Sequence, residues 1–327
     1  MNNNFHIFKT FDAYNNKMET GNFFPVYYGI EVTRHCNFKC IICPHSQLSS
    51  KEKGHMDEKT FEKIVLAISP FAKIIKLHWI GEPLLHPKII DLIKFVRKNT
   101  SAKLYLSTNG SMLSGKKSEQ IRSSGIDKLI ITLNGFYQPN NKILKLKKQI
   151  LKNAEFFINS VLNKGGPICH LKMFKFKDND EEINKFIQKW TCNDCVIADI
   201  MWISNWAGNV PGIRNISDFR NPISNNTRTP CSDLWFKMQI DWRGSVALCC
   251  FDAKCSINIG NIKQNNIEEL WHNIIIKKIR KEQINDTYTG ICSACLDWAV
   301  PSEYEFWYKD EELIKDPQRI WTGEKLI

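Results

Sequence analysis

The chain has 327 residues, of which 43% are hydrophobic and 24% are charged, and its formal net charge is +11. This composition is ordinary for a folded globular protein with one large domain and a smaller one. No run of about 18 uncharged apolar residues is present, so no membrane span is expected. The first residues lack a basic segment followed by an apolar stretch, so we expect no secretory signal and a cytoplasmic location.

The excess of positive charge does not by itself indicate a nucleic-acid partner. The densest basic run, residues 142–152, has lysines at helical spacing and apolar residues on another face, which is typical of a solvated amphipathic helix. No nucleic-acid module with interleaved aromatic residues is present, so nucleic acid is not expected as a partner. The charge is compatible with an anionic substrate or an acidic electron-donor protein.

From Tyr27 to about Trp202 the sequence alternates short strand-like runs with helical patterns. Strands are expected at 27–33, 74–79, 103–107, 128–133, 169–174 and 196–202. Helices are expected between them, near 61–68, 89–96, 114–123, 141–163 and 180–190. Six such units favour a parallel sheet with right-handed crossovers, and they fall short of the eight units of a closed barrel. We therefore expect an α/β fold with a partial (β/α)6 TIM-like barrel, open on one side.

A second, smaller domain is expected after this barrel. Residues 203–230 are rich in Asn, Pro, Gly and Ser and indicate a connector, so we place the boundary near residue 220. The predicted domains are therefore 1–220 and 221–327. The second should contain a hairpin-like segment, one or two helices and a helical C-terminal tail.

Cys36, Cys40 and Cys43 form a C-x3-C-x2-C cluster just after the first expected strand. In a cytoplasmic chain, 12 cysteines indicate metal binding or catalysis rather than disulfides. Three thiolates leave one metal position open, as a site that does chemistry requires, and thiolates favour iron–sulfur clusters, zinc and Cu(I). From these residues alone, a zinc knuckle with a distant fourth ligand stays an alternative. The loop follows a strand, where parallel α/β folds place their catalytic groups.

This spacing resembles the signature of the radical S-adenosylmethionine (SAM) superfamily. In that family SAM binds the open iron of a [4Fe–4S] cluster through its amino and carboxylate groups. The run Gly81-Glu82-Pro83 resembles the family's Gly-Gly-Glu-Pro motif, which holds the SAM amino group, although Ile80 replaces the first glycine. The partial barrel is also the usual fold of the family.

The resemblance implies further SAM contacts at the ends of later strands. Strand-end hydroxyls and amides would hydrogen-bond the ribose and carboxylate of SAM, a cation would meet the carboxylate, and the residue before the third cysteine would lie near adenine. These expected contacts are Ser107, Asn109, Thr132, Asn134, Lys172 and Ile42. The family often has Ser and Asp at the fourth strand and an aromatic residue before the third cysteine, so this chain departs from the pattern there. Without the resemblance, the Asn-Gly pairs read as ordinary turns and Lys172 as a surface lysine.

A second cysteine cluster lies between residues 231 and 295. Pairs of cysteines joined by a long excursion are typical of small iron–sulfur or zinc modules, so zinc again stays an alternative. The stretch from about 220 to 300, with Gly244-x4-Cys249 and Cys292-x2-Cys295, resembles the SPASM/twitch auxiliary-cluster domain. The resemblance implies one auxiliary [4Fe–4S] cluster, because no cysteine follows Cys295. Its expected ligands are Cys231, Cys249, Cys292 and Cys295, with Cys250 as an alternative to Cys249, while Cys255, Cys192 and Cys195 stay unassigned.

Together these resemblances imply a radical SAM oxidoreductase with SAM and two [4Fe–4S] clusters as cofactors. The reduced first cluster would cleave SAM to a 5′-deoxyadenosyl radical, which removes a hydrogen atom from the substrate. The auxiliary cluster would accept an electron, and a flavodoxin- or ferredoxin-type protein would supply the reductant. The expected substrate is a small polar molecule such as a sugar or cyclitol alcohol.

Two alternatives stay open. The first is a peptide-modifying enzyme, but only 26 residues precede the first strand, too few for a separate peptide-recognition domain. The second is an iron–sulfur or zinc protein that only binds, which would leave Gly81-Glu82-Pro83 without a purpose. Asn205, Trp206 and Asp252 are candidate substrate contacts, and no catalytic base is assigned.

Overall fold

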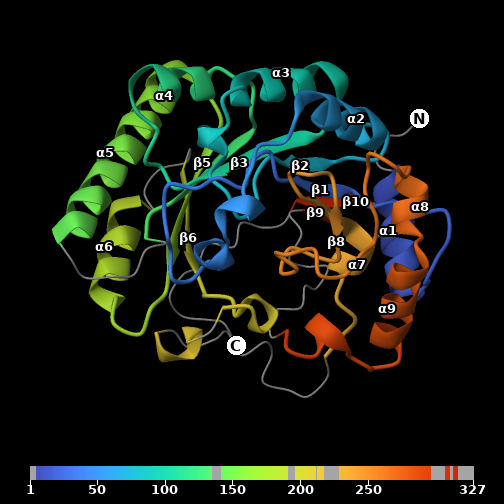
Figure 1. Ribbon diagram of the computed structural model, residues 1–327. Coiled ribbons are helices and arrows are strands. Elements are labelled where there is room, and N and C mark those ends of the chain that lie inside the picture. Colours follow the sequence, from blue (N-terminus) through green and yellow to red (C-terminus); the bar gives the residue numbers. More distant parts are fainter. Residues whose placement is uncertain are drawn as a thin grey trace.

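The computed structural model describes residues 5–134, 141–190, 196–210, 212–216 and 228–295, and the strands at 306–309 and 312–315. Six strands and five helices alternate through the first part of the chain, and neighbouring strands of the sheet are parallel and follow chain order. The strands are β1 (Tyr27–Ile30), β2 (Ile74–Lys76), β3 (Lys103–Thr108), β4 (Lys128–Thr132), β5 (Ile168–Phe174) and β6 (Val196–Met201). The helices are α2 (Glu58–Ile68), α3 (Ile89–Asn99), α4 (Gly115–Arg122), α5 (Asn141–Lys164) and α6 (Asp180–Trp190). The predicted (β/α)6 arrangement is confirmed (Figure 1).

The two faces of this sheet differ in chemistry. One face, the outer face, is apolar and packs on the buried sides of the helices, which follow the outside of the strands (Figure 1). Helix α2 is typical of this layer, because Asp57 caps its first turn and Phe61, Ile64 and Ile68 are buried at helical spacing. The opposite, inner face carries Lys76, Tyr105 and Lys128, which are register partners on β2, β3 and β4.

The second domain continues the same sheet. Its elements are α7 (Asp233–Phe236), β7 (Lys237–Ile240), β8 (Val246–Ala247), α8 (Ile267–Trp271) and α9 (Ile274–Ile284). Strand β7 pairs in parallel with β1, and β8 pairs antiparallel with β7, so the sheet has eight strands in the order β6-β5-β4-β3-β2-β1-β7-β8. The sequence indicated a hairpin here but not that it extends the barrel. The boundary predicted near residue 220 lies outside the described residues.

Three features complete the fold. Helix α1 (Phe5–Asn15), which the sequence reasoning did not predict, packs against α7, with Phe11 and Phe236 rings 4.6 Å apart. It lies on the same side of the molecule as α8 and α9 (Figure 1). Short 3-10 helices are η1 (Pro44–Gln47), η2 (Ser50–Glu52), η3 (Pro83–Leu85), η4 (Trp206–Gly208), η5 (Ile213–Asn215) and η6 (Gly290–Cys292). Within the described part of the chain, no helix is long and apolar enough to cross a membrane.

The prediction of a helical C-terminal tail is wrong where the structure describes that tail. Strands β9 (Phe306–Lys309) and β10 (Glu312–Lys315) pair antiparallel and form a two-stranded sheet of their own. The sequence of β9 contains three consecutive aromatic residues, a residue type that is enriched in strands.

Candidate functional site

The loop that carries Cys36, Cys40 and Cys43 leaves the carboxyl end of β1, at the edge of the sheet where chemistry was expected. Cys43 N donates to Cys40 O at 3.2 Å, so the last two cysteines belong to one turn. Burial raises the pKa of Cys40, and the nearby Cys43 and Cys36 raise it further. Burial also raises the pKa of Cys43 to about 12. Three sheltered thiols that influence one another fit a polynuclear metal ligand set, since bound metal deprotonates a coordinating thiol.

Glu82 joins this loop to β3. Its side chain is 2% exposed, and its carboxylate accepts hydrogen bonds from Leu84 N at 3.1 Å, Thr108 Oγ1 at 2.7 Å and Asn109 N at 2.7 Å. Burial raises the pKa of Glu82 to about 7, against the effect of those donors. Glu82 N also donates to His35 O at 2.8 Å. The carboxylate is therefore held in one orientation beside the cysteine loop.

Asn109 forms a small network with two residues that the sequence reasoning missed. Its Nδ2 donates to Asn37 Oδ1 at 2.9 Å, Asn37 Nδ2 donates to Ser111 Oγ at 3.0 Å, and Ser111 Oγ donates to Asn109 Oδ1 at 2.6 Å. Burial raises the pKa of Cys36, and hydrogen bonds from Phe38 N and the Asn109 side chain oppose that rise. Asn37 lies inside the C-x3-C spacing, which was the only sequence signal for it.

The remaining predicted SAM contacts fall into two groups. Ser107, Thr132 and Lys172 lie on the inner face of the sheet, and Thr132 and Lys172 are register partners. The side-chain amide of Asn134 and the carbonyl oxygen of Ile42 already have protein partners. Asn134 exchanges two hydrogen bonds with the backbone of Phe174, at 2.9 and 2.6 Å, and Ile42 O accepts from Trp206 Nε1 at 2.9 Å. Their roles toward SAM stay predictions.

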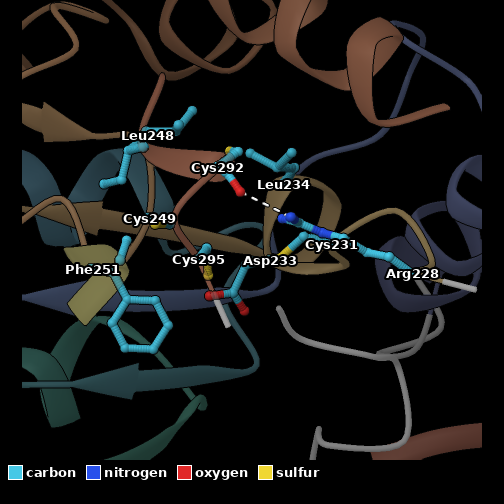
Figure 2. Close-up of a pocket in the computed structure, with 11 residues that line it drawn as sticks. Arg228, Cys231, Asp233, Leu234, Leu248, Cys249, Phe251, Cys292 and Cys295 are labelled. Atoms are coloured by element: carbon cyan, nitrogen blue, oxygen red, sulfur yellow. Dashed lines mark hydrogen bonds between the residues drawn. The ribbon is translucent and has the colours of Figure 1, made fainter. Parts of the chain in front are cut away.

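The second cysteine site is a cavity lined by Cys231, Cys249, Cys292 and Cys295 (Figure 2). Apolar side chains line much of the rest, and Arg228 Nη1 donates to Cys292 O at 2.9 Å, the dashed line in Figure 2. Burial raises the pKa of Cys249 and of Cys292. Four thiols around one apolar cavity fit a closed iron–sulfur ligand set.

Gln283 on α9, which the sequence did not indicate, does not line this cavity but contacts the backbone of one of its cysteines. Its Oε1 accepts from Cys231 N at 3.0 Å. Cys250 and Cys255 are not among the lining residues. Cys250 Sγ instead lies 3.8 Å from Asp233 Oδ2, and Cys192 and Cys195 lie outside the described residues. Within the parts of the chain that are described, no three His, Cys, Asp or Glu side chains are arranged to hold a single metal ion.

Two tryptophans, Trp79 and Trp206, contact residues next to the cysteines and link the two cysteine-bearing parts of the chain. Trp79 Nε1 donates to Cys250 O at 2.7 Å, and the Trp206 ring, whose indole bonds Ile42, lies edge-on to Phe251 with ring centroids 5.7 Å apart. Trp206 and Ala207 both have a φ of 51°, a left-handed conformation that is strained for residues other than glycine. The junction therefore has a defined, strained geometry.

The other two candidate substrate contacts have structural partners. Asn205 caps η4 through Ala207 N at 2.9 Å and donates to Ala294 O at 3.0 Å, between the last two cysteines. Asp252 organises a turn by accepting from Ser256 N and Oγ at 2.8 and 2.7 Å. Contact with substrate stays a prediction for both residues.

Comparisons with known proteins agree with this geometry. The model of the radical SAM superfamily matches residues 30–189, and the SPASM model, an iron–sulfur cluster-binding domain, matches residues 231–296. The S-adenosyl-L-methionine-dependent 2-deoxy-scyllo-inosamine dehydrogenase of Niallia circulans is 25% identical over 296 residues, which cover 85% of this chain and 96% of that protein.

Two solved structures share the fold. BtrN in complex with AdoMet and 2-DOIA has a TM-score of 0.59 and 21% identity, and the match covers 87% of this chain and 98% of that one. Streptococcus suis SuiB bound to the precursor peptide SuiA has a TM-score of 0.61 and 16% identity, with 88% and 72% covered. The chain therefore belongs to the radical SAM superfamily: it is a radical SAM enzyme that binds SAM and iron–sulfur, with a C-terminal SPASM domain.

Proposed function

We propose that this enzyme reductively cleaves SAM at a [4Fe–4S] cluster bound by Cys36, Cys40 and Cys43 and then oxidises a small polar substrate, such as a sugar or cyclitol alcohol. The observation that carries the proposal is the position of these three thiols at the carboxyl edge of the sheet, against Glu82 and Asn109. When bound, the reduced cluster and SAM together supply a 5′-deoxyadenosyl radical, and the protein contributes position and exclusion of water.

Glu82 would receive the amino group of SAM. Three donors already fix its carboxylate, and the remaining lone pairs of the two oxygens can accept from an ammonium group. Because burial raises the pKa of Glu82 to about 7, a cation beside it would favour the ionised form. Gly81 and Pro83 shape the turn. Lys172 would meet the SAM carboxylate, and Ser107, Asn109, Thr132, Asn134 and the Ile42 backbone would contact the rest of SAM.

The four cysteines of the second cavity would hold one auxiliary [4Fe–4S] cluster. Four thiolates leave no open position for substrate, so the role we propose is electron acceptance, which makes the reaction a net oxidation. The similarity to a SAM-dependent dehydrogenase along 85% of the chain supports this direction. The net charge of +11 supports an acidic flavodoxin or ferredoxin as reductant. Modification of a peptide is the alternative, and the fold shared with SuiB is compatible with it.

The test is SAM cleavage by anaerobically reconstituted protein. The wild type should hold about eight irons per chain and form 5′-deoxyadenosine under reducing conditions. Cys40→Ala should lose SAM cleavage and about half of the iron, because the first cluster loses one of its ligands. Iron content and chromatographic detection of 5′-deoxyadenosine measure both effects.

Cys255→Ala is the matched control, because Cys255 does not line the second cavity and should leave iron content and SAM cleavage at wild-type levels. Wild-type SAM cleavage by Cys40→Ala would contradict the proposal. Supplying cyclitols in one set of reactions and precursor-like peptides in another separates the two substrate classes.

A further inference from the structure

Asn109 connects the cysteine loop with the turn that carries Glu82. Its backbone N donates to Glu82 Oε2 at 2.7 Å, and its side-chain amide donates a hydrogen bond to the Cys36 thiol. The hydrogen bonds that oppose the rise in pKa of Cys40 and Cys43 come instead from backbone amides. Cys36 thus receives a donor from a side chain that follows β3, whereas the cysteine loop itself follows β1.

Two further side chains fix the orientation of the Asn109 amide. Ser111 donates to Asn109 Oδ1 from its Oγ at 2.6 Å and from its backbone N at 3.0 Å. Asn109 Nδ2 donates to Asn37 Oδ1 at 2.9 Å, and Asn37 Nδ2 donates to Ser111 Oγ at 3.0 Å, which closes a ring of three side chains. Because an amide nitrogen carries two hydrogens, Asn109 can bond Asn37 and Cys36 at once.

The turn that carries this ring is anchored from the helix layer. Asn153 on α5 is 4% exposed, and its Nδ2 donates to Gly110 O at 2.9 Å and to Ser111 O at 3.2 Å. Asn37, in contrast, is exposed at the surface. Its side chain is therefore held by hydrogen bonds to Asn109 and Ser111 rather than by packing in the core.

A hydrogen bond to a cysteine ligand changes the energy of an iron–sulfur cluster. The reduction potential of such a cluster depends on hydrogen bonds to its sulfurs and on its exposure to solvent. One-electron reduction adds negative charge, part of which the thiolate ligands carry, and a donor stabilises that charge. Burial of Cys36 acts in the opposite direction, because it disfavours added negative charge. The Asn109 amide therefore opposes the effect of burial on this ligand.

We propose that Asn37 and Ser111 are positioning residues that hold the Asn109 amide on Cys36, and that this hydrogen bond raises the reduction potential of the first cluster. The inference rests on the proposed function, because it concerns the cluster proposed at the cysteine loop. Without the donor, the cluster would be harder to reduce. At a given potential of the reductant, fewer molecules would then be ready to cleave SAM.

The test is a redox titration of the anaerobically reconstituted holoenzyme without SAM, followed by electron paramagnetic resonance. The reduced-cluster signal that is missing from Cys40→Ala belongs to the first cluster. Asn109→Leu removes the donor at similar volume and should make reduction about tenfold less favourable, a midpoint about 59 mV more negative. Asn37→Ala and Ser111→Ala should shift the midpoint less and in the same direction, because the amide remains but is no longer held.

Two controls separate this role from a purely structural one. Ser111→Thr keeps the hydroxyl and should keep the wild-type midpoint. Asn273→Leu makes the same change as Asn109→Leu at another half-buried site, where Asn273 Nδ2 donates to Ile259 O and its Oδ1 accepts from Ile275 N. It should lower the unfolding midpoint but leave the potential of the first cluster unchanged.

An unchanged or more positive midpoint in Asn109→Leu would overturn the proposal. If Asn109→Leu does not retain the iron of the first cluster, the midpoints of Asn37→Ala and Ser111→Ala decide in its place. Wild-type midpoints in both of these variants would then overturn it.

SAM cleavage with dithionite as reductant is measured on the same preparations, so the two proposals fail separately. Absence of 5′-deoxyadenosine from the iron-loaded wild type refutes the proposed function, while the titration still tests the hydrogen bond. Normal SAM cleavage with equal midpoints in the wild type and Asn109→Leu refutes only this inference.

Discussion

Gly81 lies where the structure has no room for a side chain. A Cβ at this position would be 2.0 Å from Thr33 O and 2.8 Å from Thr33 C, and backbone atoms cannot move aside as a flexible side chain can. The backbone before Glu82 therefore lies directly against Thr33, in the segment that leads to Cys36. Ile80, which replaces the first glycine of the family motif, is 4% exposed and packs with Leu48 and Ala253 at the domain junction. The structure therefore accommodates Ile80 in place of the motif's first glycine by burying its side chain among apolar residues.

Gly81→Ala should lower the free energy of unfolding by about 1–3 kcal/mol, because the added methyl overlaps backbone. It should also weaken SAM binding, since Glu82 must shift. Gly165→Ala is the control: nothing lies within 4 Å of its Cβ, and only its φ of +71° makes it costly, by about 1 kcal/mol. Urea denaturation and SAM equilibrium binding measure the two effects. Equal SAM affinity in the two variants would argue against a role for this contact at the site.

At the scale of elements, a buried ionic group joins β1 to the turn after β7. Arg34 Nη2 lies 2.7 Å from Glu31 Oε2 and 3.9 Å from Asp241 Oδ2, and all three side chains are at most 2% exposed. Trp242 N also donates to Glu31 Oε2 at 3.3 Å. Burial raises the pKa of Glu31 to about 7, and the Arg34 guanidinium opposes that rise. This group ties the first strand of the barrel to the SPASM domain.

Arg34→Met should destabilise the protein by about 3–5 kcal/mol, because it leaves the buried Glu31 carboxylate without its cation, while Asp241 keeps its pair with Arg243. Glu31→Gln in the same chain should recover part of the loss by removing that charge. Lys185→Ala, which breaks an exposed pair with Glu181, should cost about 0.5 kcal/mol at most. Chemical denaturation compares the three. A cost for Arg34→Met no larger than that for Lys185→Ala would contradict a structural role for the group.

On the scale of the whole molecule, the segment before β1 is held by the helices near the C-terminal end of the described chain. Arg280 on α9 is fully buried, lies 4.6 Å from the Trp271 ring centroid and 5.0 Å from that of Phe23, and donates to Glu19 O at 2.9 Å. His272 Nε2 lies 3.1 Å from Phe23 O, and the imidazole ring of His272 packs edge-on against the ring of Phe23. Both residues join parts of the chain about 250 positions apart.

The contribution of the contact between His272 and Phe23 to stability should depend on pH. Burial lowers its pKa to about 4, whereas an unfolded histidine titrates near about 6.5, so the unfolded state binds the proton first as the pH falls. The stability that neutral His272 contributes should therefore be present above about pH 6.5 and lost progressively toward about pH 4. His272→Gln keeps a hydrogen-bond donor and should flatten that decline, while Lys185→Gln should not. Unfolding midpoints measured across this window decide the matter, and identical slopes for wild type and His272→Gln would count against it.

The sequence by itself determined what is local and periodic. Alternation of apolar strands with amphipathic helices such as 61–68 predicts six βα units, and the spacing of Cys36, Cys40 and Cys43 predicts a three-thiol loop after the first strand. Each of these signals is contained in a short stretch of sequence, so it can be recognised without knowing which other parts of the chain pack against that stretch. The spacing Cys292-x2-Cys295 is likewise a local signal that the sequence shows by itself.

The tertiary structure alone decided which distant residues meet. It placed β7 beside β1, Thr108 on the Glu82 carboxylate and Asn37 beside Asn109. A two-residue period says only that Lys76 and Ile74 share a face, whereas the register between strands sets which other side chains join them. Register and strand order arise from long-range pairing and packing, which no local stretch of sequence contains.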